Sequence, residues 1–368
     1  MRLVSSTALI CCLLSLFSST IFADPPQEQR RVILITLDGL RSEEVFGGAD
    51  QRLIVKENGV DDVIATTKRF WRETAEERRE VLMPFLWETC QGPSGWIAGD
   101  VTQDSHVSVT NGLYFSYPGY NEILSGFPDA KVNSNAKKNN QNITVLEWLH
   151  SKPEFAQSVA AYCSWDVFPF IINESRSGIP VNAGWEDLVT GDPETIRSLN
   201  YVANNLFHEW DGVRYDSFTA SGAIQEMTTK KPKVLFVALG ETDDWAHKGR
   251  YDRYLLTANQ NDGFIRDLYQ TAQQIPEYQD KTLFIITSDH GRGDGREGWK
   301  NHGVTLPGSE RIWMAAFGPG LSRSGIDNGG NYEQAQIAAT VAAYLGQDFQ
   351  KHHEKVRPPL PILKLNAE

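Results

Sequence analysis

The chain is short of basic charge, of cysteine and of low-complexity sequence. Its 368 residues carry a formal net charge of −12 at pH 7, and 22% of them are charged. A chain this acidic argues against nucleic acid polymers as the main partner, because a phosphate backbone requires a basic surface. An anionic substrate would need bound cations to offset the negative field of the protein. The ordinary composition also excludes extensive disorder away from the ends.

The apolar segment near the N-terminus is too short to span a membrane. It covers residues 8–17, follows Arg2 and leads through small residues to Ala23, whereas a spanning helix needs about 20 apolar residues. This pattern is typical of a cleaved secretory signal. We therefore predict a signal peptide at residues 1–23 and a secreted or periplasmic protein without a transmembrane anchor. A lipid-modified cysteine in this segment is the weaker alternative.

Only two cysteines, Cys90 and Cys163, follow the predicted signal. In an oxidising compartment they could form a disulfide, but the sequence gives no distance between them, and two free thiols fit equally well. The mature chain, residues 24–368, is long enough to bury a large core, and we predict a single catalytic domain. Residues 164–231 show no clean hydrophobic period, and we interpret them as an insertion over or beside the sheet.

Three apolar runs of strand length form the framework of the predicted fold. They cover residues 32–37, 234–239 and 282–287. Nearly continuous apolar runs are typical of parallel strands that are buried on both faces. Between them the sequence predicts helices, one of which starts with a capping box at Thr74 and is interrupted at Pro84. These features predict an α/β fold with a mostly parallel central sheet.

Acidic and imidazole side chains follow each of these strands. Asp38 comes directly after the first, Asp243 and His247 follow the second, and Asp289 and His290 follow the third. Any one of these residues alone is more simply explained as a helix cap or a turn residue. The carboxyl ends of parallel strands meet at one edge of a sheet, so we expect these side chains to converge. Their recurrence at three strand ends indicates a shared site.

The converging side chains have the chemistry of metal ligands. We expect one divalent ion to be held by Asp38, Asp289 and His290, and a second by Asp243, His247 and His302. Four residues separate Asp243 from His247, so one helical turn would aim both at the same ion. Mixed histidine and carboxylate ligands favour zinc, with manganese or iron as alternatives.

A helix is predicted to begin at Ser116, because Pro118 suits a first helical turn and Gly126 suits a helix end. Serine in this position is most often a capping residue. A helix N-terminus also presents free N–H groups to an anion, which would stabilise a phosphorylated serine. Beside two ions about 3.5–4 Å apart, Ser116 would be activated as a nucleophile for phosphoryl transfer.

A series of motifs occurs in a fixed order between Val32 and Gly303. They are Thr36-Leu37-Asp38-Gly39, Ser116-Tyr117-Pro118, Leu124-Ser125-Gly126, Asp243 to His247, Ser288-Asp289-His290-Gly291 and Asn301-His302-Gly303. As an ordered set they resemble the alkaline phosphatase superfamily, most closely its nucleotide pyrophosphatase/phosphodiesterase branch. The resemblance implies an α/β/α sandwich. It also implies one metal bound by Asp243, His247 and His302, and another by Asp38, Ser116, Asp289 and His290, with Ser116 as the nucleophile.

The chain departs from this branch close to the nucleophile. Ser116 stands where the branch usually has threonine, and Gly119-Tyr120 stands where it has an Asn-His pair. Asn135 lies at about the place of the branch's substrate-binding asparagine. Related sulfatases carry an arginine where this chain has Tyr120, so a sulfatase is less expected. The preference for monoesters or diesters stays open.

These features predict a two-metal phosphoester hydrolase that works through a phosphoseryl intermediate on a small-molecule or envelope phosphoester. A phosphotransferase and a catalytically silent module that binds phosphate esters are the alternatives. The loop at residues 291–298 adds Arg292 and Arg296, with Lys300 nearby. These cations could contact an anionic substrate, but we expect them to be solvated.

Overall fold

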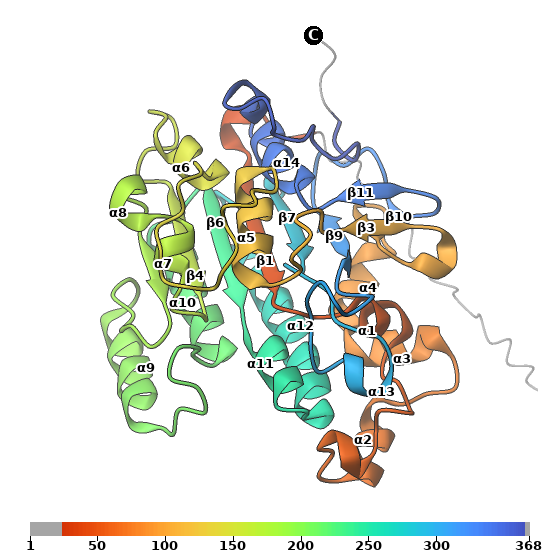
Figure 1. Ribbon diagram of the computed structural model, residues 1–368. Helices are drawn as coiled ribbons and strands as arrows, with labels where there is room; N and C mark the ends of the chain where they lie inside the picture. Colours follow the sequence, from red (N-terminus) through yellow and green to blue (C-terminus); the bar gives the residue numbers. More distant parts are fainter. Residues whose placement is uncertain (1–23, 365–368) are drawn as a thin grey trace, which may run out of the picture.

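The computed structural model describes residues 24–364, in which an eight-stranded sheet forms the centre of the molecule (Figure 1). The strand order is β10-β2-β9-β7-β1-β6-β4-β5. The strands are β1 (Arg31–Leu37), β2 (Gly95–Ala98), β4 (Val159–Cys163), β5 (Val181–Ala183), β6 (Val234–Leu239), β7 (Thr282–Thr287), β9 (Met314–Phe317) and β10 (Gly325–Ile326). The predicted signal peptide at residues 1–23 lies outside the described residues.

The three predicted strands lie next to one another in the sheet. β1 is central and pairs in parallel with β6 on one side and β7 on the other. The register aligns their ends, because Leu37 pairs with Leu239 and Thr36 pairs with Thr287. The residues that follow β1, β6 and β7 therefore leave the sheet at the same level. Only β9 runs against its neighbours β2 and β7, so the sheet is mostly parallel, as predicted.

Helices cover both faces of the sheet, because every side of these continuous apolar strands is buried. One face packs against α5 (Ser116–Ser125), α6 (Val145–His150), α7 (Phe168–Ile171) and α14 (Gln336–Tyr344). The other packs against α1 (Ser42–Gly47), α3 (Ala75–Leu82), α4 (Pro84–Cys90), α10 (Asp216–Thr229), α11 (Glu241–His247) and α12 (Tyr251–Gln274). The predicted α/β/α sandwich is confirmed.

The remaining elements surround this sandwich. They are α2 (Val63–Phe70), α8 (Glu174–Ser177), α9 (Pro193–Asn205), α13 (Gly295–Gly298), the short 3-10 helices η1 (Gln27–Gln29), η2 (Lys56–Asn58), η3 (Val101–Gln103) and η4 (Phe349–Lys351), and a second sheet of β3 (His106–Ser108), β8 (Arg311–Ile312) and β11 (Asn331–Glu333). Residues 164–231, interpreted as an insertion, supply the edge strand β5 and helices α7 to α10.

Local signals in the sequence set several helix boundaries. Thr74 forms the predicted capping box with Glu77 at the start of α3, and Pro84 begins α4 as a separate helix. Proline is well accommodated in a first turn, because the first N–H groups of a helix have no partner within it. Gly126 ends α5 with φ 81°, a left-handed conformation that glycine adopts without strain.

The two cysteines lie on opposite faces of the sheet. Cys90 belongs to the core beneath α4, and Cys163 belongs to the core on the α5 side. Both are buried and free. The open choice between a disulfide and two free thiols is therefore resolved in favour of free thiols. Among residues 24–364 no helix is both long and apolar enough to cross a membrane.

Candidate metal centre

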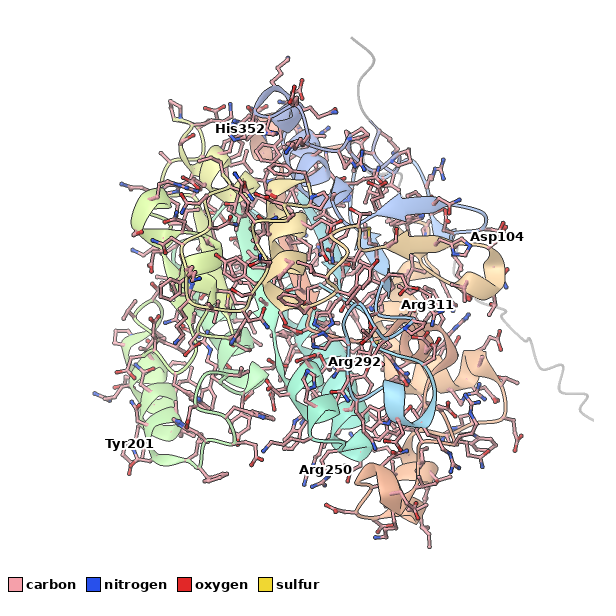
Figure 2. All side chains as sticks on the ribbon, in the orientation of Figure 1. Asp104, Tyr201, Arg250, Arg292, Arg311 and His352 are labelled. Carbon is pink, nitrogen blue, oxygen red and sulfur yellow. The ribbon has the colours of Figure 1, made fainter. Side chains whose placement is uncertain are left out.

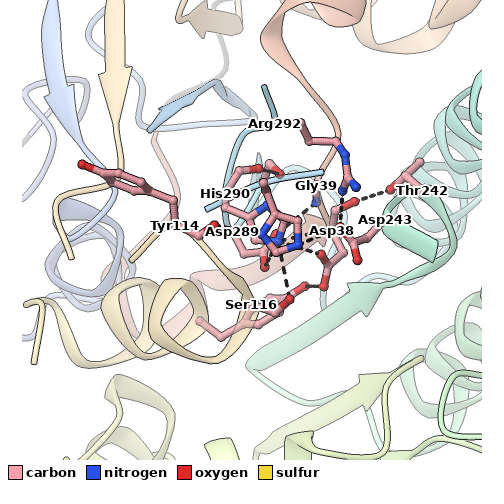
Figure 3. Close-up of polar contacts among 12 residues, drawn as sticks. Asp38, Gly39, Tyr114, Ser116, Thr242, Asp243, Asp289, His290 and Arg292 are labelled. Atoms are coloured by element: carbon pink, nitrogen blue, oxygen red, sulfur yellow. Dashed lines mark hydrogen bonds and ion pairs between the residues drawn. The ribbon is translucent and has the colours of Figure 1, made fainter. Parts of the chain in front are cut away.

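The predicted ligands meet where β1, β6 and β7 end against the N-terminus of α5 (Figure 3). Asp38 follows β1, Asp289 and His290 follow β7, and Asp243 lies in the first turn of α11, which follows β6. Ser116 is the first residue of α5. The aligned register of the three strands brings groups more than 200 residues apart in sequence within contact distance. The expected convergence is observed.

One group of ligand atoms surrounds Nε2 of His290. The Asp38 Oδ1 lies 3.4 Å from this nitrogen, the Asp289 Oδ2 3.5 Å and the Ser116 Oγ 3.4 Å. Ligands that bind zinc at about 2.0–2.2 Å in a tetrahedron are separated from one another by about 3.3–3.6 Å. The three measured separations match this spacing. We refer to Asp38, Ser116, Asp289 and His290 as the inner group.

The inner group contains buried oxygen atoms without a hydrogen-bond donor. Asp38 Oδ1 and Asp289 Oδ2 have no partner among the described residues. Burial raises the pKa of both carboxyl groups well above the usual range, and the charge of Asp243 adds to the shift of each. An unsatisfied buried carboxylate is costly unless a cation or a donor faces it. A divalent cation between these oxygens would remove that cost, so the residues present fit a metal ion.

The other polar atoms of the inner group are held by the protein. Tyr120 donates its hydroxyl to Asp38 Oδ2 at 2.9 Å, and the Gly39 N–H donates to Asp289 Oδ1 at 3.1 Å. His290 Nδ1 lies 2.9 Å from the carbonyl oxygen of Gly291, which sets this nitrogen as the donor. Nε2 then carries the lone pair, which faces the other ligands. Such outer contacts orient metal ligands in proteins.

A second group of ligand atoms lies toward the surface. His247 Nε2 is 3.2 Å from Asp243 Oδ2 and 3.0 Å from His302 Nε2. His302 Nε2 is 3.7 Å from Asp243 Oδ1. Burial and the charge of His290 lower the pKa of His302 to about 2, so this imidazole is neutral and available as a ligand. We refer to Asp243, His247 and His302 as the outer group.

A strained backbone segment positions His302. Its Nδ1 lies 2.9 Å from the carbonyl oxygen of Tyr114, which sets Nδ1 as the donor and leaves Nε2 free. Tyr114 has φ 56°, a conformation that non-glycine residues seldom adopt. The side chain of Asn111 stabilises this turn, because its Oδ1 accepts the N–H groups of Leu113 and Tyr114. The turn that starts at Asn111 thus presents a carbonyl to a ligand of the outer group.

Arg292 lies inside the site rather than in solvent. Its side chain is fully buried and forms an ion pair with Asp243 through Oδ1, while Nε donates to the carbonyl of Trp299 at 2.7 Å. The expectation of solvated charge is wrong for Arg292, because the loop folds back over the end of β7. It agrees with the structure at Arg296, which is exposed. Burial favours the protonated form of Asp243, but the charge of Arg292 and the hydrogen bond from His247 outweigh it, and the pKa lies well below the usual range.

Two glycines permit the close approach of these groups. A Cβ at Gly39, where φ is 59°, would lie 2.6 Å from Arg292 Nη1 and 2.7 Å from Asp243 Oδ1. A Cβ at Gly119 would lie 2.3 Å from the carbonyl oxygen of Asp289. Gly119 therefore lets α5 approach the end of β7 closely enough for Ser116 to reach the inner group. Gly119 and Tyr120, which replace the Asn-His pair of the phosphodiesterase branch, thus both have structural roles, since Tyr120 also binds Asp38.

Asn135 lies beside the N-terminus of α5. It is exposed, and its Oδ1 accepts the N–H of Tyr117 at 3.0 Å. This contact satisfies one of the free N–H groups of the helix, next to Ser116. The side-chain amide is thus close to the position that a phosphoryl group on Ser116 would occupy.

The sequence does not predict the contacts that Tyr120, Arg292 and Tyr114 make in the site. Tyr120 stands out only as a departure from related patterns, and Arg292 only as a cation near the predicted site. Arg292 directly follows the motif Ser288-Asp289-His290-Gly291, and this adjacency was the available signal. No local pattern indicates that the carbonyl of Tyr114 would meet His302, because that contact joins residues 188 positions apart.

Comparison with solved structures identifies the fold. No family model and no curated protein matches the sequence. The alkaline phosphatase PafA aligns with a TM-score of 0.55 at 11% identity, covering 89% of this chain and 97% of that one. A putative sulfatase from Bacteroides thetaiotaomicron aligns at 0.53 and 11% identity, over 87% and 71% of the two chains. Murine ectonucleotide pyrophosphatase/phosphodiesterase 5, in complex with AMP, aligns at 0.50 and 10% identity, over 90% and 97%.

These similarities confirm the resemblance at the level of the fold. The chain has the alkaline phosphatase-like fold, which it shares with phosphatases, phosphodiesterases and sulfatases of that superfamily. At this level of sequence identity the similarity does not distinguish among their reactions. The chemistry must be argued from the residues of this chain.

Proposed function

We propose that the chain is a two-metal phosphoester hydrolase in which Ser116 is the nucleophile. One observation carries the proposal: the Ser116 Oγ lies as close to His290 Nε2 as the unpartnered oxygen of Asp38 does, at 3.4 Å. A serine at that position is a member of the ligand set rather than a helix cap. The structure is consistent with this distinction, since Ser116 makes no capping hydrogen bond and is itself the first helical residue.

The inner and outer groups would hold one divalent ion each, most simply zinc, with manganese or iron as alternatives. When bound, such ions lower the pKa of a coordinated hydroxyl and stabilise the charge of the entering and leaving oxygens. In the reaction, Ser116 Oγ forms a bond to phosphorus as the ester oxygen departs, and water then cleaves the phosphoseryl ester. At the N-terminus of α5 the Ser116 N–H is left to face a phosphoryl oxygen, because Asn135 accepts the Tyr117 N–H, Pro118 has none, and the Gly119 N–H is bound within the turn. Asn135 adds a side-chain amide at the same helix end.

The location of the enzyme is proposed on the sequence alone. The pattern of residues 1–23 supports a cleaved signal peptide, and hence a secreted or periplasmic enzyme that acts on a small-molecule or envelope phosphoester. Mass determination of the mature chain from its native host would locate the cleavage site. A retained N-terminus would contradict this part of the proposal without affecting the proposed chemistry.

The proposal is tested with the purified mature chain on aryl phosphate monoesters and diesters. We expect hydrolysis that is lost on complete chelation and restored by divalent metal, and a phosphoserine at position 116 after acid quenching. The monoester-to-diester ratio then assigns the substrate class, and product analysis with added alcohols detects phosphotransfer. Hydrolysis that persists after complete metal removal would contradict the proposal. Faster turnover of an aryl sulfate than of any phosphate ester would favour a sulfatase instead.

A further inference from the structure

A second cavity lies at the same edge of the sheet as the metal centre. Its volume is about 970 Å³, and its walls come from the segments that follow β1, β2, β7 and β10, together with α3. Strand β9 runs in the opposite direction between β2 and β7, so the chains that leave those two strands are separated by its width. Ligands of open α/β sheets bind in crevices outside the carboxyl ends of the strands. The size is that of a site for a small organic molecule.

The acidic groups in the cavity wall already have partners. Glu44 pairs with Arg41, and Asp50 pairs with Arg52 at 2.7 Å. Glu43 pairs with Arg311 at 3.0 Å, and Asp294 binds the same guanidinium. Through Arg311 (labelled in Figure 2), these contacts tie the start of α1 to the loop before α13. Asp100 and Asp327, which also line the cavity, accept hydrogen bonds from hydroxyl and backbone groups and pair with neither Arg78 nor Arg79.

Arg79 in the wall is a buried cation without an anionic partner. Its side chain is 8% exposed, and its Nε has no hydrogen-bond acceptor. It forms no ion pair within the described part of the chain. Its guanidinium lies 3.9 Å from the ring centroid of Trp87, so an aromatic face covers one side of the group. Such stacking offsets part of the cost of burial but accepts none of the N–H donors.

Its neighbour Arg78 also lines the cavity without an acidic partner. It donates to the carbonyl oxygens of Gly47, Arg72 and Glu73, which leaves its charge uncompensated by a carboxylate. Glu76, one turn earlier on α3, is exposed and pairs with neither arginine in the structure. Two adjacent cations without acidic partners thus line the same open cavity in a protein whose net charge is −12. This is the arrangement that recognises a bound anion.

We propose that this cavity is a second ligand site, which binds a small organic anion by placing a phosphate or carboxylate group against Arg79. The fork of a guanidinium pairs with either group through two parallel hydrogen bonds. Arg78 strengthens the local field, and the remaining volume takes the body of the molecule. The site requires no metal ion and is independent of the reaction proposed for Ser116.

Calorimetric titration of the metal-loaded full chain tests this site. Inorganic phosphate and succinate serve as probes, since they separate a phosphate-selective site from a carboxylate-selective one. We expect at least one of them to show a binding event that persists after chelation and weakens at least about tenfold in Arg79→Gln. Arg79→Lys keeps the charge but lacks the fork, so it should show an intermediate loss.

Arg52→Gln is the matched control, because Arg52 lines the same cavity but is 78% exposed and already paired. We expect this variant to bind the probe as the wild type does. Equal weakening in Arg52→Gln and Arg79→Gln would overturn the proposal, since it would indicate a general effect of charge. The absence of any metal-independent binding of either probe would overturn it as well.

If Arg79→Gln does not fold, the site is tested by soaking selenate into crystals of the wild-type chain. We expect anomalous density within hydrogen-bond distance of the Arg79 guanidinium. Density confined to other positions would contradict the site. Loss of hydrolysis in Ser116→Ala bears only on the metal centre, so the two proposals fail separately.

Discussion

The inner and outer groups of ligands use the same chemistry but differ in how the protein holds them. The inner group is buried. Its members follow the central strands β1 and β7 or begin α5, and Tyr120 and the Gly39 N–H fix its carboxylates. The outer group comes from the helix α11 and a loop, and His247 is 39% exposed. A buried cage loses its ion only when water and ligands rearrange, whereas an exposed one exchanges more easily. We therefore expect a tightly held inner ion and an exchangeable outer ion.

Replacement of the nucleophile should have the largest effect. Ser116→Ala removes the reacting oxygen from the inner group but leaves its two carboxylates and His290. We expect kcat to fall by at least about 10⁴-fold, as it does when other covalent nucleophiles are removed, with both ions retained by elemental analysis. Ser125→Ala, at the other end of α5, is the control and should keep activity within about twofold. Activity of Ser116→Ala near the wild-type level would contradict the role of Ser116.

Substitution of single ligands tests the difference between the two groups directly. Asp289→Asn should remove the inner ion and reduce activity by roughly 10³-fold, because the ion beside the nucleophile is lost. His247→Ala should leave one tightly bound ion and a weaker outer site. Metal content after dialysis against graded chelator measures the difference. If the ion that remains in Asp289→Asn resisted chelator better than the ion that remains in His247→Ala, the order of affinities would be reversed.

Arg292→Lys tests whether Arg292 positions Asp243 as a ligand of the outer group. Arg292 holds Asp243 through Oδ1 and leaves Oδ2 toward His247, so its loss should weaken the outer ion by about 10–100-fold, the usual cost of an outer contact. The inner ion should be unaffected. Metal titration of chelated protein separates the two. Arg296→Lys, in the same loop but exposed, is the control; equal losses in both variants would refute a positioning role.

Tyr120→Phe tests the support of the inner group. It removes the donor to Asp38 Oδ2, and we expect a loss of about tenfold in inner-ion affinity with a smaller loss in kcat. Tyr117→Phe is a matched control on the same helix, because its hydroxyl donates to the carbonyls of Lys138 and Phe170 instead. Equal inner-ion affinity in Tyr120→Phe and Tyr117→Phe would show that the hydrogen bond from Tyr120 to Asp38 does not support the inner ion.

The smallest effect expected is on the pH dependence of stability after chelation. The pKa values of Asp38 and Asp289 are raised in the fold, so the folded state keeps protons that the unfolded chain releases. Stability of the metal-free protein should then fall as pH rises above about 4, the ordinary carboxyl range. Asp243, with a lowered pKa, is already ionised there and adds no slope, whereas His302, with a pKa lowered to about 2, gives an opposing slope below about pH 6.5.

Thermal unfolding at pH 5, 6.5 and 8 with and without chelator measures this slope. We expect the midpoint of the chelated protein to drop by roughly 5 °C between pH 6.5 and 8, and the slope there to flatten in Asp289→Asn. A midpoint that rose between pH 6.5 and 8 in the chelated protein would show that the two carboxyl groups are not destabilising when ionised.

Much of the fold was predictable because its signals are local. The continuous apolar runs that became β1, β6 and β7 need no partner to be recognised as buried strands. The capping box at Thr74 and the Gly126 end of α5 are likewise set by neighbours in the chain. The candidate ligands were predictable for a related reason, since each follows a strand whose end is visible in the sequence.

Contacts between distant segments were not predictable. In the sequence, Arg292 is one of several charged residues in a glycine-rich loop. Only the folded loop shows that its side chain is buried against Asp243. Tyr120 became a partner of Asp38 because Gly119 lets α5 approach β7. Cys90 and Cys163 stayed ambiguous until the sheet placed them on opposite faces.

The sequence by itself determined which residues are able to bind metal and in what order they occur, because side-chain chemistry and strand periodicity are properties of the chain. The tertiary structure decided how they are grouped. The register of β1 with β6 and β7 set which oxygens face His290 Nε2, and burial decided which charges lack partners. Distances and desolvation arise only when the segments pack together, so the two ligand groups and the unpaired Arg79 could be recognised only in the folded chain.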